Sequence, residues 1–191
     1  GDHITLGTAD LEDAITLNTF DTSNFTLDNV DQAVILAAGT VRGALSVTTS
    51  TSGTITQTGA LTVTGNATFT TEANNQAITL SNGSNNFGGN VILSTAGTSG
   101  NVTIDNGTNA LMLQGTVLGN LTVTNQGTIG DSDTLRVTGT SSFTTEASGN
   151  HITLGTADLE EAITLSTTNT SNFTLDNVDQ AVILAAGTVR G

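Results

Sequence analysis

The chain repeats itself: residues 3–43 return almost unchanged as residues 151–191, 148 positions later. These 41-residue copies differ at four positions only, which are Asp13/Glu161, Asn18/Ser166, Phe20/Thr168 and Asp21/Asn169. Such self-similarity is typical of a protein made by adding one module, so the module determines the fold. We therefore interpret residues 1–43 as the end of one 148-residue module and residues 44–191 as one further complete module, in which 149–191 repeats 1–43.

A weaker repeat lies inside the module. The segment LTVTGNATFTTEA at 61–73 matches LRVTGTSSFTTEA at 135–147, and residues 77–80 match 151–154 at the same offset. Because this offset is half of the offset between the long copies, we interpret the module as a duplicated half-module whose copies have diverged. We expect the repeat to continue past this segment. Gly191 matches Gly43, so an alanine equivalent to Ala44 would follow it.

Short β-strands are indicated along the whole chain by triplets that mostly read apolar, threonine, apolar. Alternation with period two, together with β-branched residues, predicts strands that bury one side and expose the other. Glycine and asparagine between the triplets predict turns. The best helical candidate, residues 8–14, is so short that a bulged corner is favoured there. The predicted strands are residues 4–6, 15–17, 25–27, 34–36, 45–47, 61–63, 69–71, 78–80, 91–93, 102–104, 111–113, 121–123 and 135–137.

Short strands, frequent turns and a stacking repeat predict an all-β fold, a parallel β-helix (β-solenoid) that forms one continuous segment over residues 1–191. We expect coils of roughly 18–19 residues, about four in each half-module and about ten in the chain, and a rod on the order of 50 Å long. Aliphatic side chains would fill the interior, with ladders of Asn and Thr along the corners. The absence of Pro fits, since nearly every strand residue must donate a hydrogen bond to the next coil. A β-sandwich is the alternative.

Charge excludes several classes of partner. The chain has 17 Asp+Glu against 3 Lys+Arg, a net charge of −14. Such a polyanion cannot make the phosphate contacts that dominate nucleic-acid binding, and anionic membrane surfaces repel it. Without cysteine it forms no disulfide and no zinc–thiolate site. It also has no apolar stretch of the length that spans a bilayer, so no membrane insertion is expected.

Three stretches of the chain resemble the repeats of large secreted bacterial adhesins, the filamentous-haemagglutinin-like, β-strand-repeat surface proteins. They are GALTVTGNATFTTEANNQAITLSNGSNNFGGNVIL, NVTIDNGTNALMLQGTVLGNLTVTNQGTI and LRVTGTSSFTTEASGNHITL. The resemblance covers essentially the whole chain. It implies a right-handed parallel β-helix, export across the outer membrane of a Gram-negative bacterium to the cell surface, and a role as an extended stalk or fibre in adhesion.

No constellation for catalysis is evident, and we predict that the chain is not an enzyme. His3 and His151, the two histidines, occupy the same repeat position. A catalytic base needs a partner acid or nucleophile in a pocket, and a site repeated along a rod would be unusual. We interpret both as surface residues at strand starts. A polysaccharide-degrading β-helix enzyme stays a remote alternative, since it needs acids and bases in a groove.

The acidic residues form clusters that repeat with the module. Carboxylates two or three residues apart can chelate calcium, although the calcium-binding nonapeptide of β-rolls and the EF-hand loop are missing. A solvated acidic face is the favoured interpretation, and no other cofactor is expected. Calcium bound between neighbouring rods, which a fall in melting temperature on chelation would reveal, is the alternative. Its candidate ligands are Asp10, Glu12, Asp13, Asp158, Glu160 and Glu161.

These observations predict a structural segment of a secreted fibre or adhesin stalk that acts through length and rigidity. Its expected partner is itself, by covalent or end-to-end continuation and by lateral pairing of rods, with a host or neighbouring-cell surface as a further partner. The alternative is a carbohydrate- or receptor-binding face, against which the lack of Trp and Tyr argues. An ice-binding threonine surface is a remote alternative, because the spacing of the threonines drifts and ordinary β-propensity explains them.

Overall fold

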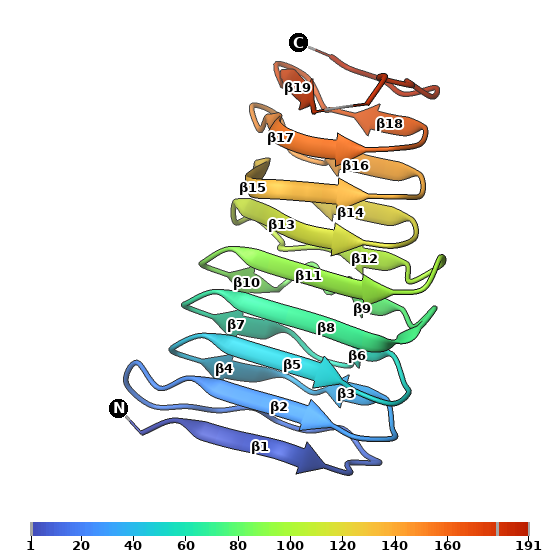
Figure 1. Cartoon of the computed structure of the whole chain (residues 1–191). Coiled ribbons are helices and arrows are strands. Elements are labelled where there is room, and N and C mark those ends of the chain that lie inside the picture. Colours follow the sequence, from blue (N-terminus) through green and yellow to red (C-terminus); the bar gives the residue numbers. More distant parts are fainter. Residues whose placement is uncertain (1, 179, 191) are drawn as a thin grey trace.

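The computed structural model describes residues 2–178 and 180–190, and its strands pair in parallel as the coils of a β-solenoid (Figure 1). No helix occurs among these residues, and hence none that could cross a membrane. The all-β parallel β-helix predicted from the repeat is therefore confirmed, and the β-sandwich is excluded. The corner favoured for residues 8–14 is also confirmed, since β1 (Ile4–Ala9) ends there and the chain turns.

Three parallel sheets form the sides of the rod. Sheet A, in front in Figure 1, has nine strands, sheet B behind it has seven, and sheet C has three. Sheet A contains β1, β2 (Phe25–Asn29), β5 (Leu45–Thr49), β8 (Ala67–Asn74), β11 (Val91–Ala96), β13 (Leu111–Val117), β15 (Ile129–Val137), β17 (Ile152–Leu159) and β19 (Phe173–Asn177). Sheet B contains β3 (Val34–Leu36), β6 (Ile55–Gln57), β9 (Ile78–Leu80), β12 (Val102–Ile104), β14 (Leu121–Asn125), β16 (Ser141–Thr145) and β18 (Ile163–Ser166). Sheet C contains β4 (Gly39–Val41), β7 (Leu61–Val63) and β10 (Asn86–Phe87).

Almost every predicted strand is present. The exception is residues 15–17, which make only isolated bridges to the coil above, at Ile15 to Leu36 and Asn18 to Thr40. The repeat copy of this segment is strand β18, which pairs with β16. The same residues therefore form a full strand where a coil lies beneath them.

The coils are longer and fewer than predicted. Seven steps along sheet A lead from β1 to β17, its copy 148 positions later, so a coil averages about 21 residues. The coils are also unequal in length. The ladder pairs Leu111 with Ile129, 18 residues later, but it pairs Ala67 with Val91, 24 residues later. The expectation of four coils per half-module and about ten in the chain is thus corrected to three and a half per half-module and about eight turns. Corner loops of unequal length account for the difference.

An odd number of coils per module places the two half-modules on opposite sides of the rod. Residues 69–71 belong to β8 in sheet A, whereas their counterparts 143–145 belong to β16 in sheet B. Conversely, residues 78–80 form β9 in sheet B and their counterparts 152–154 lie in β17 of sheet A. Half a module is therefore three whole coils and one half-turn, and the half-turn moves the chain to the opposite side of the rod.

One apolar core runs the length of the rod. Inward residues of successive coils are stacked by the ladder, as in Leu27, Val47 and Phe69, all of which are completely buried. Phe69 packs edge-to-face on Phe87 of sheet C, which lies later in the same coil, with ring centroids 5.9 Å apart, a favourable geometry for aromatic pairs.

Candidate functional surface

The two histidines lie at the surface and hold neighbouring coils together. The Nδ1 atom of His3 accepts a hydrogen bond from the backbone N–H of Asn24 (3.0 Å), and Nδ1 of His151 accepts one from Asn172 (2.9 Å). Asn24 does the same for the next coil, because its Oδ1 accepts the N–H of Ala44 (2.8 Å). Both histidines therefore occupy a position that elsewhere holds a coil-linking asparagine.

Outward asparagines repeat this link along the rod. Oδ1 of Asn101 accepts the N–H of Asn120 (2.8 Å), and Oδ1 of Asn120 accepts the N–H of Thr140 (2.9 Å). Each such amide satisfies a backbone donor in the coil above, where the strand of that coil begins. The corner ladders of Asn expected from the sequence are thus present.

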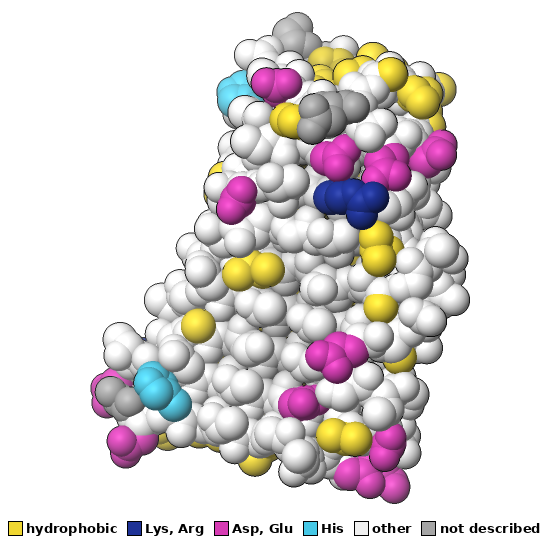
Figure 2. Space-filling view, viewed as in Figure 1, with side chains coloured by type: hydrophobic (Ala, Val, Ile, Leu, Met, Phe, Trp, Pro, Cys, Tyr) yellow, Lys and Arg dark blue, Asp and Glu magenta, His cyan; other side chains and the backbone are white. Residues whose placement is uncertain are grey.

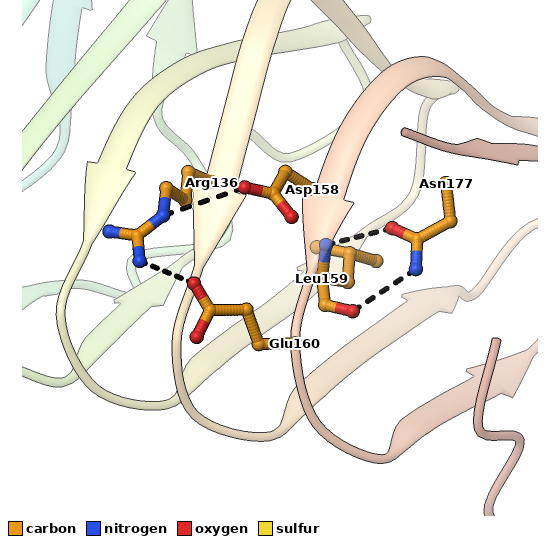
Figure 3. Close-up of polar contacts among 5 residues, drawn as sticks. All are labelled: Arg136, Asp158, Leu159, Glu160 and Asn177. Carbon is orange, nitrogen blue, oxygen red and sulfur yellow. Dashed lines mark hydrogen bonds and ion pairs between the residues drawn. The ribbon is translucent and has the colours of Figure 1, made fainter. Parts of the chain in front are cut away.

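The acidic cluster of the second copy surrounds an arginine (Figure 3). Arg136 of β15 and Asp158 of β17 are paired across the ladder, with Arg136 Nε 3.5 Å from Asp158 Oδ2, and Arg136 also donates from Nη2 to Glu160 Oε1. Glu161, the third carboxylate predicted for this cluster, is exposed. A guanidinium therefore lies beside the two inner carboxylates, where a calcium ion would otherwise have to bind.

The first copy of the cluster has no such arginine within the described residues. Asp10, Glu12 and Asp13 are exposed at the corner that follows β1. Among residues 2–178 and 180–190, no group of three or more His, Asp or Glu side chains could hold a metal ion. Calcium between neighbouring rods stays a prediction.

A shallow hollow on sheet A brings Asp131 and His151 to one wall with Met112 and Thr153. Both oxygens of Asp131 accept backbone N–H groups of β17, from Gly155 (2.8 Å) and Thr156 (2.7 Å). His151 accepts the N–H of Asn172, as described above. The two titratable side chains of this hollow are therefore bound to backbone donors, and they shape the bend of β17 and its contact with β19.

Two flat faces lie on opposite sides of the rod, each made of four regular strands. The lower flat face is the outer side of β2, β5, β8 and β11 in sheet A, and the upper flat face is the outer side of β12, β14, β16 and β18 in sheet B. Their strands are half-module counterparts, and the acidic side chains of each face lie at its margins. They are Asp28 in the first strand and Glu72 past the paired part of β8 on the lower face, and Asp105 and Glu146, directly after β12 and β16, on the upper face. The other outward residues are Thr26, Ser46, Thr48, Thr68, Thr70, Ile92 and Ser94 on the lower face and Thr103, Thr122, Thr124, Ser142, Thr144, Thr164 and Ser166 on the upper face.

The hydroxyl groups of the flat faces form straight files. Thr103, Thr122 and Ser142 are direct partners in the ladder of sheet B. Hydrogen bonds connect the flat-face hydroxyls to no other group of the described residues, whereas the inward hydroxyl of Thr49 donates to the carbonyl of Gly53 (2.9 Å). Sequence patterns predicted outward threonines. They did not predict that the threonine faces of successive half-modules lie on opposite sides of the rod, because this depends on the number of coils in a half-module.

Comparison with known proteins gives one family. Residues 22–94 and 99–166 both match the family model described as "Repeats of unknown function (DUF5649)". No match was found among curated proteins or among solved structures. The first matched segment begins before β2 and ends in β11, both in sheet A, and the second begins before β12 and ends in β18, both in sheet B. Each matched segment therefore carries one flat face.

Proposed function

The chain belongs to the DUF5649 repeat family, and from this premise we propose that it is a structural segment of a long fibre, the stalk of a secreted adhesin at the surface of a Gram-negative bacterium. The observation that carries the proposal is that one module equals a whole number of coils. β1 and β17 are copies 148 positions apart, and both lie in sheet A with seven steps between them. Each added module therefore continues the rod with the same faces on the same sides.

A second observation supports additive growth. Val34 and Leu36 are 1% and 0% exposed beneath the coil that follows them, whereas their copies Val182 and Leu184, with no coil above, are 51% and 63% exposed. The same residues thus become core when a further coil stacks on them. In a solenoid, stability is close to a sum of coil and interface contributions, so longer arrays are the more stable ones.

The test is the length of single rods. We would extend the chain with one and then two further copies of residues 44–191 and measure rod length by negative-stain microscopy and small-angle scattering. Seven coils at the strand spacing of a sheet add about 34 Å per module. A chain of separate globular beads, or a length that does not grow in this step, would contradict the proposal. Labelling of intact cells with an antibody against the module tests the surface location.

A further inference from the structure

Charge is distributed along the rod in bands. Between residues 32 and 130 the only charged residues are Arg42, Glu72 and Asp105, whereas residues 131–179 contain eight acids and a single arginine, Arg136. Residues 1–31, which repeat 149–179, contain seven acids and neither Lys nor Arg. Figure 2 shows the consequence on the sheet A side, where acidic side chains gather towards both ends and mostly uncharged surface lies between them.

The centre of each flat face is uncharged within this acidic molecule. Their acidic residues, Asp28 and Glu72 on the lower face and Asp105 and Glu146 on the upper face, lie at the margins, and Ser50 Oγ donates to Asp28 Oδ1. The central files, such as Thr26, Ser46 and Thr68, are uncharged. Rods of net charge −14 repel one another over most of their surface. A second rod can therefore approach most closely at the uncharged centre of a flat face, where straight files of Thr and Ser offer a regular surface of the kind that stacked β-sheets pack together.

We propose that copies of this rod pair side by side through their flat faces, the lower flat face of one rod against the upper flat face of the next. This inference rests on the proposed function, since it requires rods of several modules. Because the two flat faces point to opposite sides, each rod has a neighbour on both sides, and the assembly is an open raft and not a closed dimer. The two faces lie half a module apart along the rod. Neighbouring rods that run in the same direction are therefore shifted along the rod axis by three and a half coils, about 17 Å.

The size of a flat face sets how many modules are needed. Four strands of about five residues cover roughly 19 by 17 Å, so one contact buries roughly 650 Å² in total. Specific interfaces need about 1,200 Å² or more, so a single contact is too small. Rods of several modules make several contacts at once, and their affinities combine steeply. The 191-residue chain should therefore stay monomeric where longer rods assemble.

The experiment compares the 191-residue chain with a version extended by two further copies of residues 44–191, using sedimentation velocity and negative-stain microscopy. We expect single rods for the short chain and concentration-dependent rafts for the long one. Thr70→Glu in every module places a charge on each lower flat face, and Thr144→Glu, its half-module counterpart, places one on each upper flat face. The file that contains Thr70 already accommodates Arg136 and Asp158 further along sheet A, so a glutamate there is compatible with folding.

Neither variant should form rafts alone, but a mixture of the two should form one-to-one pairs, because each retains the face that the other lacks. The matched control is Thr98→Glu, which adds the same charge at an exposed corner and should leave rafts intact. Long rods that stay single at all concentrations would overturn the proposal, as would rafts that both face variants still form. Pairs formed by either variant alone would overturn the lower-to-upper contact. Rod length in the same images reports on the proposed function separately.

Discussion

Buried polar side chains determine where each coil turns. Thr49 and Asn29 face the interior at the ends of neighbouring strands and are 0% exposed. Thr49 Oγ1 donates to the carbonyl of Gly53, and Asn29 Nδ2 donates to the carbonyls of Gln32 and Ala33 (3.3 and 3.2 Å). Each side chain thus satisfies carbonyls of the corner that follows it and ties that corner to the end of the strand.

Ser141 departs from this pattern and predicts a stabilising substitution. It lies in the inward file of sheet B between Leu121 and Ile163, it is 2% exposed, and its hydroxyl has no hydrogen-bond partner among residues 2–178 and 180–190. Its half-module counterpart is Ala67. Ser141→Ala removes an unsatisfied buried hydroxyl and should raise the free energy of unfolding by about 1 kcal/mol. Urea unfolding followed by circular dichroism measures the change.

Thr49→Val provides the opposite comparison. It also removes a buried hydroxyl, but one that is satisfied, and it leaves the carbonyl of Gly53 without its partner. We expect a loss of about 1–2 kcal/mol. If both substitutions changed stability in the same direction, the distinction between satisfied and unsatisfied hydroxyls would be wrong.

Asn106 should contribute more to stability than the exposed corner amides do. It is 0% exposed and terminates sheet C, since its Oδ1 accepts the N–H of Phe87 (2.6 Å) and its Nδ2 donates to the carbonyls of Phe87 (3.2 Å) and Ala110 (2.8 Å). Asn106→Ala leaves three backbone groups without these bonds, two of them on the buried Phe87, so we expect a loss of about 2–3 kcal/mol. Asn120→Ala removes an exposed link between coils, and it should lower the free energy of unfolding by less than about 1 kcal/mol. Equal losses in the same unfolding assay would contradict this assignment.

At the scale of elements, regular strands face bent ones across the core. Strands β13, β15 and β17 change register along their length, at the points where the chain bends outward. Their half-module counterparts on sheets B and C are interrupted altogether, as β3 and β4 or β6 and β7. One side of each half-module is therefore flat and the other is broken by a bend.

Gly115 makes the bend of β13 possible. Its φ is +106°, and a Cβ there would lie 2.2 Å from the carbonyl oxygen of Leu93. Gly115→Ala combines a disfavoured backbone conformation with a clash against the neighbouring coil, so we expect a loss of about 3 kcal/mol. Gly155→Ala is the control, because the nearest atom to its Cβ is 3.9 Å away. Thermal unfolding of both variants should show a large fall in melting temperature for the first only.

The sequence predicted strands well because their pattern is local. Apolar, threonine, apolar triplets are complete within three residues, as in β9 and β12. The length of a coil depends on its corners, and these vary from the short turn before β14 to the outward loop of residues 131–134 in β15. The pairing of Arg136 with Glu160, 24 residues away, follows from coil length, so no local pattern indicates it.

At the scale of the whole molecule, the half-turn between half-modules makes a testable statement about which strands are neighbours. Deleting residues 61–134 joins Ala60 to Leu135, so that LRVTGTSSFTTEA replaces its counterpart LTVTGNATFTTEA. The shortened chain should fold as a rod with three and a half fewer coils. Every strand after the junction then lies on the side opposite to its place in the intact chain.

A disulfide reports on which strands become neighbours after the deletion. Ser46 and Ser142 lie outward on sheets A and B of the intact chain, and Ser142 would take the place of Thr68, the ladder partner of Ser46, after the deletion. Cysteines at 46 and 142, the only ones in a chain that otherwise has none, should cross-link under oxidation in the shortened rod, because paired strands lie about 4.8 Å apart. They should not cross-link within the intact rod, where they lie on opposite sheets and about four coils apart. A shortened chain that does not fold, or one that folds without this cross-link, would contradict the placement of residue 142 beside Ser46, and intramolecular cross-linking of the intact chain would contradict their separation along the rod.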